Sequence, residues 1–290
     1  MVFQDLINKL RGKNQSQSDL GERLSSVKGN PEELARKLND LDREEQVDLF
    51  LNKWPDLDNE LREQIRVALE HSGLAGRWLE DCRHWEASKR LTAIEVVRVI
   101  APDGCGPVLM DLLGHKDGAT QMAAVEALSN LADRELVDGL IDALDKSKQY
   151  LPARVAQVLV NCSNLSAPLL VQAYPFASTV KKGYIIEILA QLGDDVSHET
   201  LLTALGDNAH EVRVQAAQAL GQLGLVRGIE PLIKALADES PKVRAKAAKA
   251  LGMLKAEVAA AALEEAARDE DWLVRDTAAE ALMMIKKEDS

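Results

Sequence analysis

The sequence predicts an all-α fold, a solenoid of helix pairs with a 31-residue period. Two observations support this fold. The chain is 46% apolar but only 3% aromatic, and a core rich in Ala and Leu favours closely packed helices over a β-sandwich. In addition, three segments superimpose without a gap: Asp207–Leu223, Asp238–Leu254 and Asp269–Ile285. Internal repetition at a fixed interval of this length is typical of solenoids.

The repeat can be followed toward the N-terminus along one apolar column. From Leu220 the column runs back through Leu189, Leu159, Leu128 and Val97. The steps are equal, except that the step from Leu189 to Leu159 is shorter by a single position. We therefore count about six complete units between residues 83 and 267, followed by a half-unit that reaches residue 290. The predicted solenoid domain is 83–290.

Each unit is predicted to contain two helices. In the unit that starts at Asp207, apolar residues recur at three- and four-residue steps from Val212 to Leu223, which predicts a first helix with one buried face. Gly224 is a typical helix stop, and a second apolar stripe over residues 229–236 predicts the second helix. One helix pair cannot cover its own apolar stripe, so each unit must stack on the next.

The part of the chain before the solenoid, 1–82, does not show the repeat. Residues 1–30 are predicted to be a flexible segment with a short amphipathic helix over residues 1–13. This helix could dock on a partner or a membrane surface, pack on the chain itself, or remain disordered. Residues 31–82 contain several helical patterns and are predicted to form an N-terminal cap, which would cover the open face of the first repeat.

The order of the repeated residues resembles a known family. Each of the three aligned segments places Asp, then Val-Arg, then Ala-Ala and Ala-Leu in the same register. This pattern is similar to the HEAT-like repeats named after phycobilisome lyases. The resemblance implies a right-handed α-α superhelix over residues 83–290. The sequence departs from the pattern at Met283, where the other two segments have glycine, and at Gln121 and Pro152 in the arginine column.

The repeated Asp and Arg residues are predicted to be structural. The planar fork of donors on Arg matches a carboxylate, and the family resemblance implies a ladder of such contacts at the turns. A catalytic Asp and Arg would not need three copies. The predicted ladder consists of Asp207, Arg213, Asp238, Arg244, Asp269 and Arg275.

Two enzyme classes share this type of repeat, and the sequence argues against both. Deoxyhypusine hydroxylase is one protein with this type of repeat, and its His-Glu pairs just after the Val-Arg positions bind two irons. A similar site in this chain would need His-Glu pairs at the same positions. Here those positions hold Val214-Gln215, Ala245-Lys246 and Asp276-Thr277, and the His-Glu dipeptides at His198 and His210 lie elsewhere. Bilin lyases use the same repeat, but no motif in this chain points to a tetrapyrrole. We therefore expect no metal, no cofactor and no catalytic residue.

The net charge of −12 disfavours a nucleic-acid partner, since phosphate neutralisation supplies much of the affinity in such complexes. The second helices are expected to line the concave face, and their exposed columns are mainly acidic. The candidate partner-binding residues are Asp111, Asp138, Asp142, Glu199, Glu230 and Lys234. Two interpretations remain open: a charged face that keeps the protein soluble, or an acidic groove that receives a basic or polar segment of a partner.

The sequence thus predicts a non-catalytic scaffold or adaptor that binds a protein or peptide in a bacterial cytoplasm. Neither a secretory signal nor an apolar run approaching about 18 residues occurs in it. Membrane contact is expected only through residues 1–13. The alternative function is a lyase- or hydroxylase-like enzyme, or a subunit of one, acting on a tetrapyrrole or a modified protein side chain.

Overall fold

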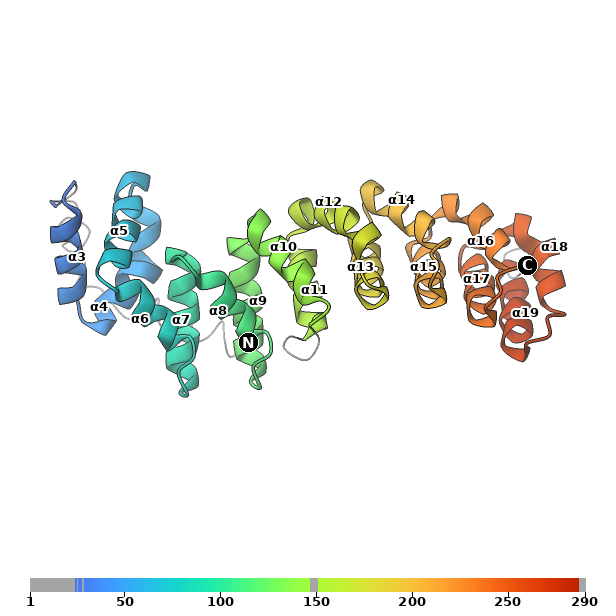
Figure 1. The fold of residues 1–290 in the computed structure, drawn as a ribbon, viewed down its shortest axis with the longest axis horizontal. Coiled ribbons are helices and arrows are strands. Elements are labelled where there is room, and N and C mark those ends of the chain that lie inside the picture. Colours follow the sequence, from blue (N-terminus) through green and yellow to red (C-terminus); the bar gives the residue numbers. More distant parts are fainter. Residues whose placement is uncertain (1–23, 25, 28, 147–150, 287–290) are drawn as a thin grey trace. The chain divides into compact units, whose positions relative to one another are not determined.

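The computed structural model describes residues 24, 26–27, 29–146 and 151–286. All regular elements of these residues are helices (Figure 1), which confirms the all-α class. The amphipathic segment predicted at residues 1–13 lies outside the described residues. In the part of the chain that the structure describes, no helix combines the length and the apolar character needed to cross a bilayer.

The chain divides into two compact units. Unit 1 consists of Met1–Leu136 and Ser147–Val158, and unit 2 of Val137–Lys146 and Leu159–Ser290. The predicted cap and the first repeats share unit 1, because α6 (Leu74–Asp81) packs against α7 (Ala87–Ile100).

The region predicted to be the cap consists of short helices around three aromatic side chains. They are α3 (Pro31–Asp40), α4 (Arg43–Asp48), a π-helical turn η1 (Leu49–Lys53), a 3₁₀ turn η2 (Trp54–Asp56), α5 (Asn59–His71) and α6. The ring of Phe50 meets those of Trp54 and Trp78 edge-on, with centroids 5.9 and 6.3 Å apart. All three side chains are buried, and they fill the irregular space between helices of different length. Trp85, at the junction with the repeats, is exposed instead.

The first repeats continue in unit 1 with α7, α8 (Cys105–Leu112) and α9 (Gly118–Leu131). Helices α10 (Arg134–Ala143) and α11 (Pro152–Asn161) each contribute residues to both units. Helix α7 packs along α9, the first helix of the next repeat, through Leu, Val, Ile and Ala side chains. The core is thus aliphatic, as the composition predicts.

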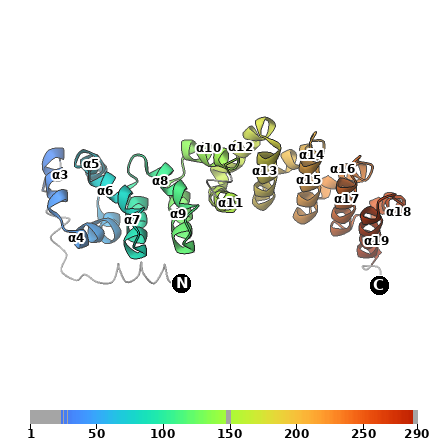
Figure 2. The same cartoon turned by 60° about the horizontal axis from the view of Figure 1, so that its bottom comes forward.

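Unit 2 repeats the helix pair, and short 3₁₀ turns lie at three of its connections. These are α12 (Ser163–Ala173), η3 (Tyr174–Phe176), α13 (Thr179–Leu192), α14 (Asp195–Ala204), α15 (His210–Leu223), η4 (Val226–Gly228), α16 (Ile229–Ala235), α17 (Pro241–Met253), η5 (Glu257–Ala259), α18 (Ala260–Ala266) and α19 (Trp272–Lys286). Figure 2 shows the first helices α13, α15, α17 and α19 side by side in one layer. The predicted helices around 212–223 and 229–236 are therefore confirmed, with a short 3₁₀ turn leading into the second.

Two glycines allow the first helices of unit 2 to approach closely. A Cβ added at Gly221 would lie 2.8 Å from the Cα of Ala250, and one at Gly252 would lie 2.8 Å from the Cα of Ala281. Such distances mean that the helix backbones touch without an intervening side chain. Met283 occupies the corresponding position of α19, one repeat after Gly252. The glycine column therefore sets the spacing of α15, α17 and α19.

Candidate functional site

The turns between repeats of unit 2 are joined by arginine side chains. Arg213 Nε and Nη2 each donate to a carboxylate oxygen of Asp238 at 2.8 Å, and Nη1 donates to the carbonyl oxygen of Asp207 at 2.9 Å. The two side chains are only 9% and 13% exposed. Burial alone would raise the pKa of Asp238, but hydrogen bonds from Arg213 and from the Ser240 amide outweigh it and hold the pKa below its usual range. One guanidinium therefore ties its own turn to the next.

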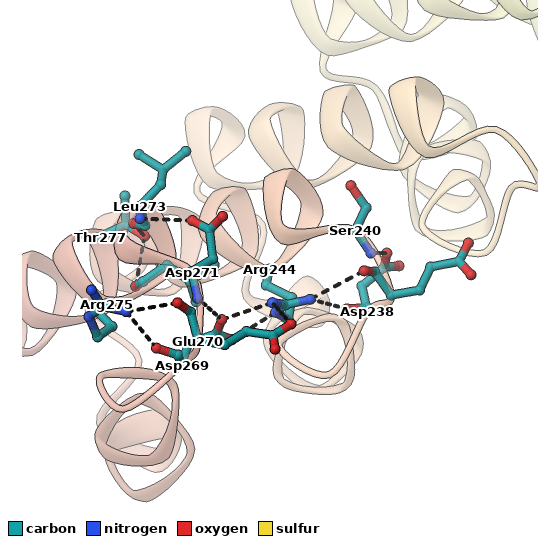
Figure 3. Close-up of polar contacts among 11 residues, drawn as sticks. Asp238, Ser240, Arg244, Asp269, Glu270, Asp271, Leu273, Arg275 and Thr277 are labelled. Carbon is teal, nitrogen blue, oxygen red and sulfur yellow. Dashed lines mark hydrogen bonds and ion pairs between the residues drawn. The ribbon is translucent and has the colours of Figure 1, made fainter.

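Arg244 repeats this arrangement one unit later (Figure 3). It donates to both carboxylate oxygens of Asp269 at 2.7 and 2.8 Å and to the carbonyl oxygen of Asp238 at 2.9 Å. Arg275 keeps only the main-chain part, with donation at 2.9 Å to the carbonyl oxygens of Asp269 and Glu270. It makes no ion pair with any described residue, and its side chain is exposed.

The ladder has further members that the sequence reasoning missed. Lys182 donates to Asp207 at 2.7 Å, and the Tyr174 hydroxyl donates to the same carboxylate at 3.1 Å. In unit 1, the buried Arg90 donates to Thr120 at 2.9 Å and to the carbonyl oxygen of His84 at 2.7 Å. Lys182 lies one repeat before Arg213. The 31-residue period therefore places Lys182 in the arginine column, although the residue type is different.

Histidines take the place of the turn aspartate in unit 1. Nδ1 of His115 accepts a hydrogen bond from the Asp117 amide at 3.0 Å, and Nδ1 of His84 accepts one from the Glu86 amide at 3.0 Å. Asp207 makes the equivalent contact to the Ala209 amide. Burial, followed by the charge of the nearby Arg90, lowers the pKa of His115 below its ordinary value. The neutral imidazole is the form that can accept this bond.

The predicted partner-binding residues are all exposed. Asp111 lies on α8 in unit 1, whereas Asp138, Asp142, Glu199, Glu230 and Lys234 lie on α10, α14 and α16 in unit 2. Three of the acids meet a basic side chain of the chain itself. The pairs are Asp111 with Arg83 at 3.2 Å, Asp142 with Lys181 at 3.1 Å, and Glu199 with Arg227 at 3.3 Å. These pairs reduce the acidic character expected of the second helices.

Two open grooves lie on the first helices of unit 2. A groove of about 450 Å³ runs between α13 and α15, and one of about 220 Å³ runs between α15 and α17. Gln218 and Gln222 line both, so the two form one surface. We call it the glutamine groove, and its polar residues are Glu187, Gln191, Gln215, Gln218, Gln222, Lys246 and Lys249. None of the six partner-binding residues predicted from the sequence lines it.

The polar side chains of the glutamine groove are available for binding. Gln218 accepts a hydrogen bond from Lys246 at 3.0 Å. The amides of Gln191, Gln215 and Gln222 make no hydrogen bond to any other described residue, and all three side chains are exposed. An amide group both donates and accepts. The groove can therefore bind groups that need both, such as main-chain peptide units.

The sequence carried a signal for this surface. Three columns of the first helices keep the 31-residue spacing while the residue type varies along the column. They are 184/215/246/277, 187/218/249/280 and 191/222/253/284. From α15 to α19 the neighbouring Val, Arg, Ala and Leu columns keep the same residue because the fold needs it. The variable columns are thus not fixed by packing, and they hold the groove residues.

The second residue of each pair compared with a di-iron site belongs to one of these columns. Gln215 and Lys246 line the grooves, and Thr277 is the next residue of that column. The two His-Glu dipeptides lie elsewhere, with His198 on α14 and His210 at the start of α15. Among the described residues, no group of three or more His, Cys, Asp or Glu side chains is placed to hold a metal ion.

Comparison with solved structures finds chains of low sequence identity. Human deoxyhypusine hydroxylase, in complex with glycerol, is 16% identical, with 92% of this chain and 96% of that chain covered and a TM-score of 0.38. The complex of CpcE and CpcF of phycocyanin lyase from Nostoc is 21% identical, with coverages of 74% and 88% and a TM-score of 0.35. Kap121p is 12% identical over 98% of this chain and 37% of its own length, with a TM-score of 0.45. No curated protein matches the chain in sequence.

The family model of HEAT repeats matches residues 77–160, 167–238 and 229–290. These ranges contain nearly all of the helix pairs counted from the sequence, and they begin within α6, just before the first repeat. The helix pairs, the 31-residue period and the family match agree. The chain belongs to the family of HEAT-repeat proteins.

Proposed function

We propose that the protein is a non-catalytic scaffold that holds a protein partner on the first-helix face of unit 2. The observation that carries this proposal is the glutamine groove, where several amide side chains without internal hydrogen bonds line an open surface on three packed helices. The Arg213 and Arg244 contacts fix the turns on which these helices start. A rigid surface loses little conformational entropy on binding, so weak contacts can add up to useful affinity.

The residue types on this face also favour binding over catalysis. The positions that would carry iron ligands in a hydroxylase-like site hold Val214-Gln215, Ala245-Lys246 and Asp276-Thr277. Of these side chains, only the Asp276 carboxylate is a usual ligand for iron, which proteins bind mainly through imidazole and carboxylate groups. A lyase- or hydroxylase-like activity on a tetrapyrrole or a modified side chain is the rival function.

The acidic second helices are a separate candidate surface for the same scaffold. Asp138 and Asp142 are exposed on α10, one helical turn apart. A partner with a basic segment would gain from their charge, mainly through a faster encounter. This surface and the glutamine groove lie on different helices, so variants can separate them.

The test uses the full-length chain as bait in an extract of its native cell, with captured proteins quantified by mass spectrometry. We expect a partner that is lost with Gln218→Ala/Gln222→Ala and retained with Asp138→Lys/Asp142→Lys. Loss only with the second variant would move the binding site to the second helices. A visible absorption band or bound iron in the purified protein, together with no enriched partner, would favour the enzyme.

A further inference from the structure

The charged side chains of the glutamine groove are separated by sign. Glu187 on α13 stands at one side and Lys246 and Lys249 on α17 at the other, with Gln215, Gln218 and Gln222 of α15 between them. Lys246 contacts the Gln218 amide, and Lys249 makes no ion pair with any described residue. In a chain of net charge −12, two neighbouring lysines that pair with no carboxylate in the described part of the chain form a local positive site.

The floor of the groove is apolar and shallow. It is formed by Ile186, Ala190, Ala219 and Ala250, of which Ile186, Ala219 and Ala250 are at most 4% exposed. Small alanine side chains leave room for a chain to lie close to the helices. At Gly183, a Cβ would come within 2.5 Å of the Gln215 amide, so the missing side chain makes space for this amide on α13.

The dimensions suit an extended segment. Neighbouring helix axes lie about 8–10 Å apart, so a path across three helices covers roughly 20 Å. An extended chain advances about 3.3 Å per residue, which corresponds to about six residues. Each peptide unit brings one donor and one acceptor that must be satisfied when water is excluded. The glutamine amides offer both groups, and no helix or sheet on the partner is required.

We propose that the glutamine groove binds an extended acidic peptide segment of the partner protein. Its main-chain amides would pair with Gln215, Gln218 and Gln222, and its Asp or Glu side chains would meet Lys246 and Lys249. This inference rests on the proposed scaffold function and adds the chemistry of the ligand. It differs from the sequence-based expectation of a basic segment, which concerned the second helices. A phosphate backbone fits less well, because it brings no main-chain N–H donors for the glutamine oxygens.

The experiment measures binding of the full-length protein to immobilised octapeptide pools. Each pool has six randomised positions and two fixed neighbours, which are Glu-Glu, Lys-Lys or Gln-Gln. We expect the Glu-Glu pool to bind about tenfold better than the Lys-Lys pool at low salt, a difference typical of two partly exposed charge pairs. The peptides enriched from the Glu-Glu pool are then made with N-methylated backbones, which should weaken binding by removing the donors for the glutamines.

The matched variants are Lys246→Glu/Lys249→Glu and Lys242→Glu. Lys242 is exposed on the same helix but does not line the groove. The double variant should reverse the preference between the Glu-Glu and Lys-Lys pools, while Lys242→Glu should leave it unchanged. Equal binding of the pools, or equal effects of the two variants, would overturn the proposal. If native partners are still lost with Gln218→Ala/Gln222→Ala in that case, the scaffold function stands and only the ligand assignment fails.

Folding of the variants is checked by urea denaturation, because all three lysines are surface residues whose replacement should not shift the midpoint. As a second route, Gln215→Ala keeps the charges and removes only one amide. It should weaken the enriched acidic peptides without changing the preference for Glu over Lys. A lost preference in this variant would contradict the separate roles of glutamines and lysines.

Discussion

At the residue scale, the arginine contacts separate a structural role from a binding role. Arg213 and Arg244 are buried and satisfy a carboxylate and a main-chain carbonyl together. Their donors are used within the chain, so they are not available to a partner. The side-chain amides of Gln191, Gln215 and Gln222 make no hydrogen bond to another described residue, so they are available to a partner. Polar residues at a fixed spacing can thus serve the fold or the ligand, and the hydrogen-bond partners show which.

Arg213→Met should lower the free energy of unfolding by about 2–4 kcal/mol, because it leaves the Asp238 carboxylate, which is only 13% exposed, without its main partner. Arg275→Met is the matched control. Like Arg213, Arg275 donates to main-chain carbonyl oxygens, but it has no carboxylate partner among the described residues. The expected loss in the free energy of unfolding is therefore below about 1 kcal/mol. Urea denaturation of both variants gives the comparison. Equal losses would mean that the carboxylate contact adds no stability.

The turn histidine predicts a pH dependence. The pKa of His115 is below its ordinary value of 6.5, so the unfolded chain takes up this proton at a higher pH than the folded chain does. The stabilising contribution is therefore complete above about pH 7.5 and is lost as the pH falls through 6.5 toward the lowered folded pKa.

His115→Asp provides the control for this pH effect. Asp207, Asp238 and Asp269 already accept the same amide contact two residues on. The variant should keep the turn and reduce the decline in unfolding free energy between about pH 7.5 and 5.5, measured by urea denaturation at each pH. An unchanged decline would assign the pH dependence to other groups.

At the element scale, the spacing of the first helices decides where a ligand can bind. Gly221 and Gly252 bring α15, α17 and α19 into backbone contact at their C-terminal halves. The exposed residues of α13, α15 and α17 then share one surface. The sequence predicted the helices and their buried faces from apolar periodicity. It did not predict this surface, because the groove depends on how closely two helices approach and not on either helix alone.

Gly221→Ala should destabilise unit 2. The added Cβ would meet the Cα of Ala250 at 2.8 Å, and the resulting overpacking costs about 1–3 kcal/mol, more than the gain of up to about 1 kcal/mol in helix propensity. Gly139→Ala on α10 is the control, since no atom lies within 4 Å of the new Cβ. It should raise the urea midpoint. Stabilisation by both substitutions would show that the helices can separate at no cost.

At the scale of the whole molecule, the fold class and the number of repeats followed from the sequence because identical residues recur at one interval. The C-terminal repeats keep Asp, Val, Arg and Leu in place, and these residues form the core and the ladder. Earlier repeats make the same contacts with other residue types, such as Lys182 for Arg and His115 for Asp. A search for identical letters misses these substitutions, whereas the period still locates them.

The ladder also gives unit 2 a direction. Each basic side chain reaches forward to the carboxylate of the following repeat, and Arg275 on α19 has no such carboxylate among the described residues. The stability of a repeat array is a sum of contacts within repeats and between neighbouring repeats. The helix that lacks a ladder contact should therefore open first. Amide hydrogens of α19 should exchange at least about tenfold faster than those of α15. A peptide bound across α13, α15 and α17 would then not rest on α19, the helix that is expected to open first.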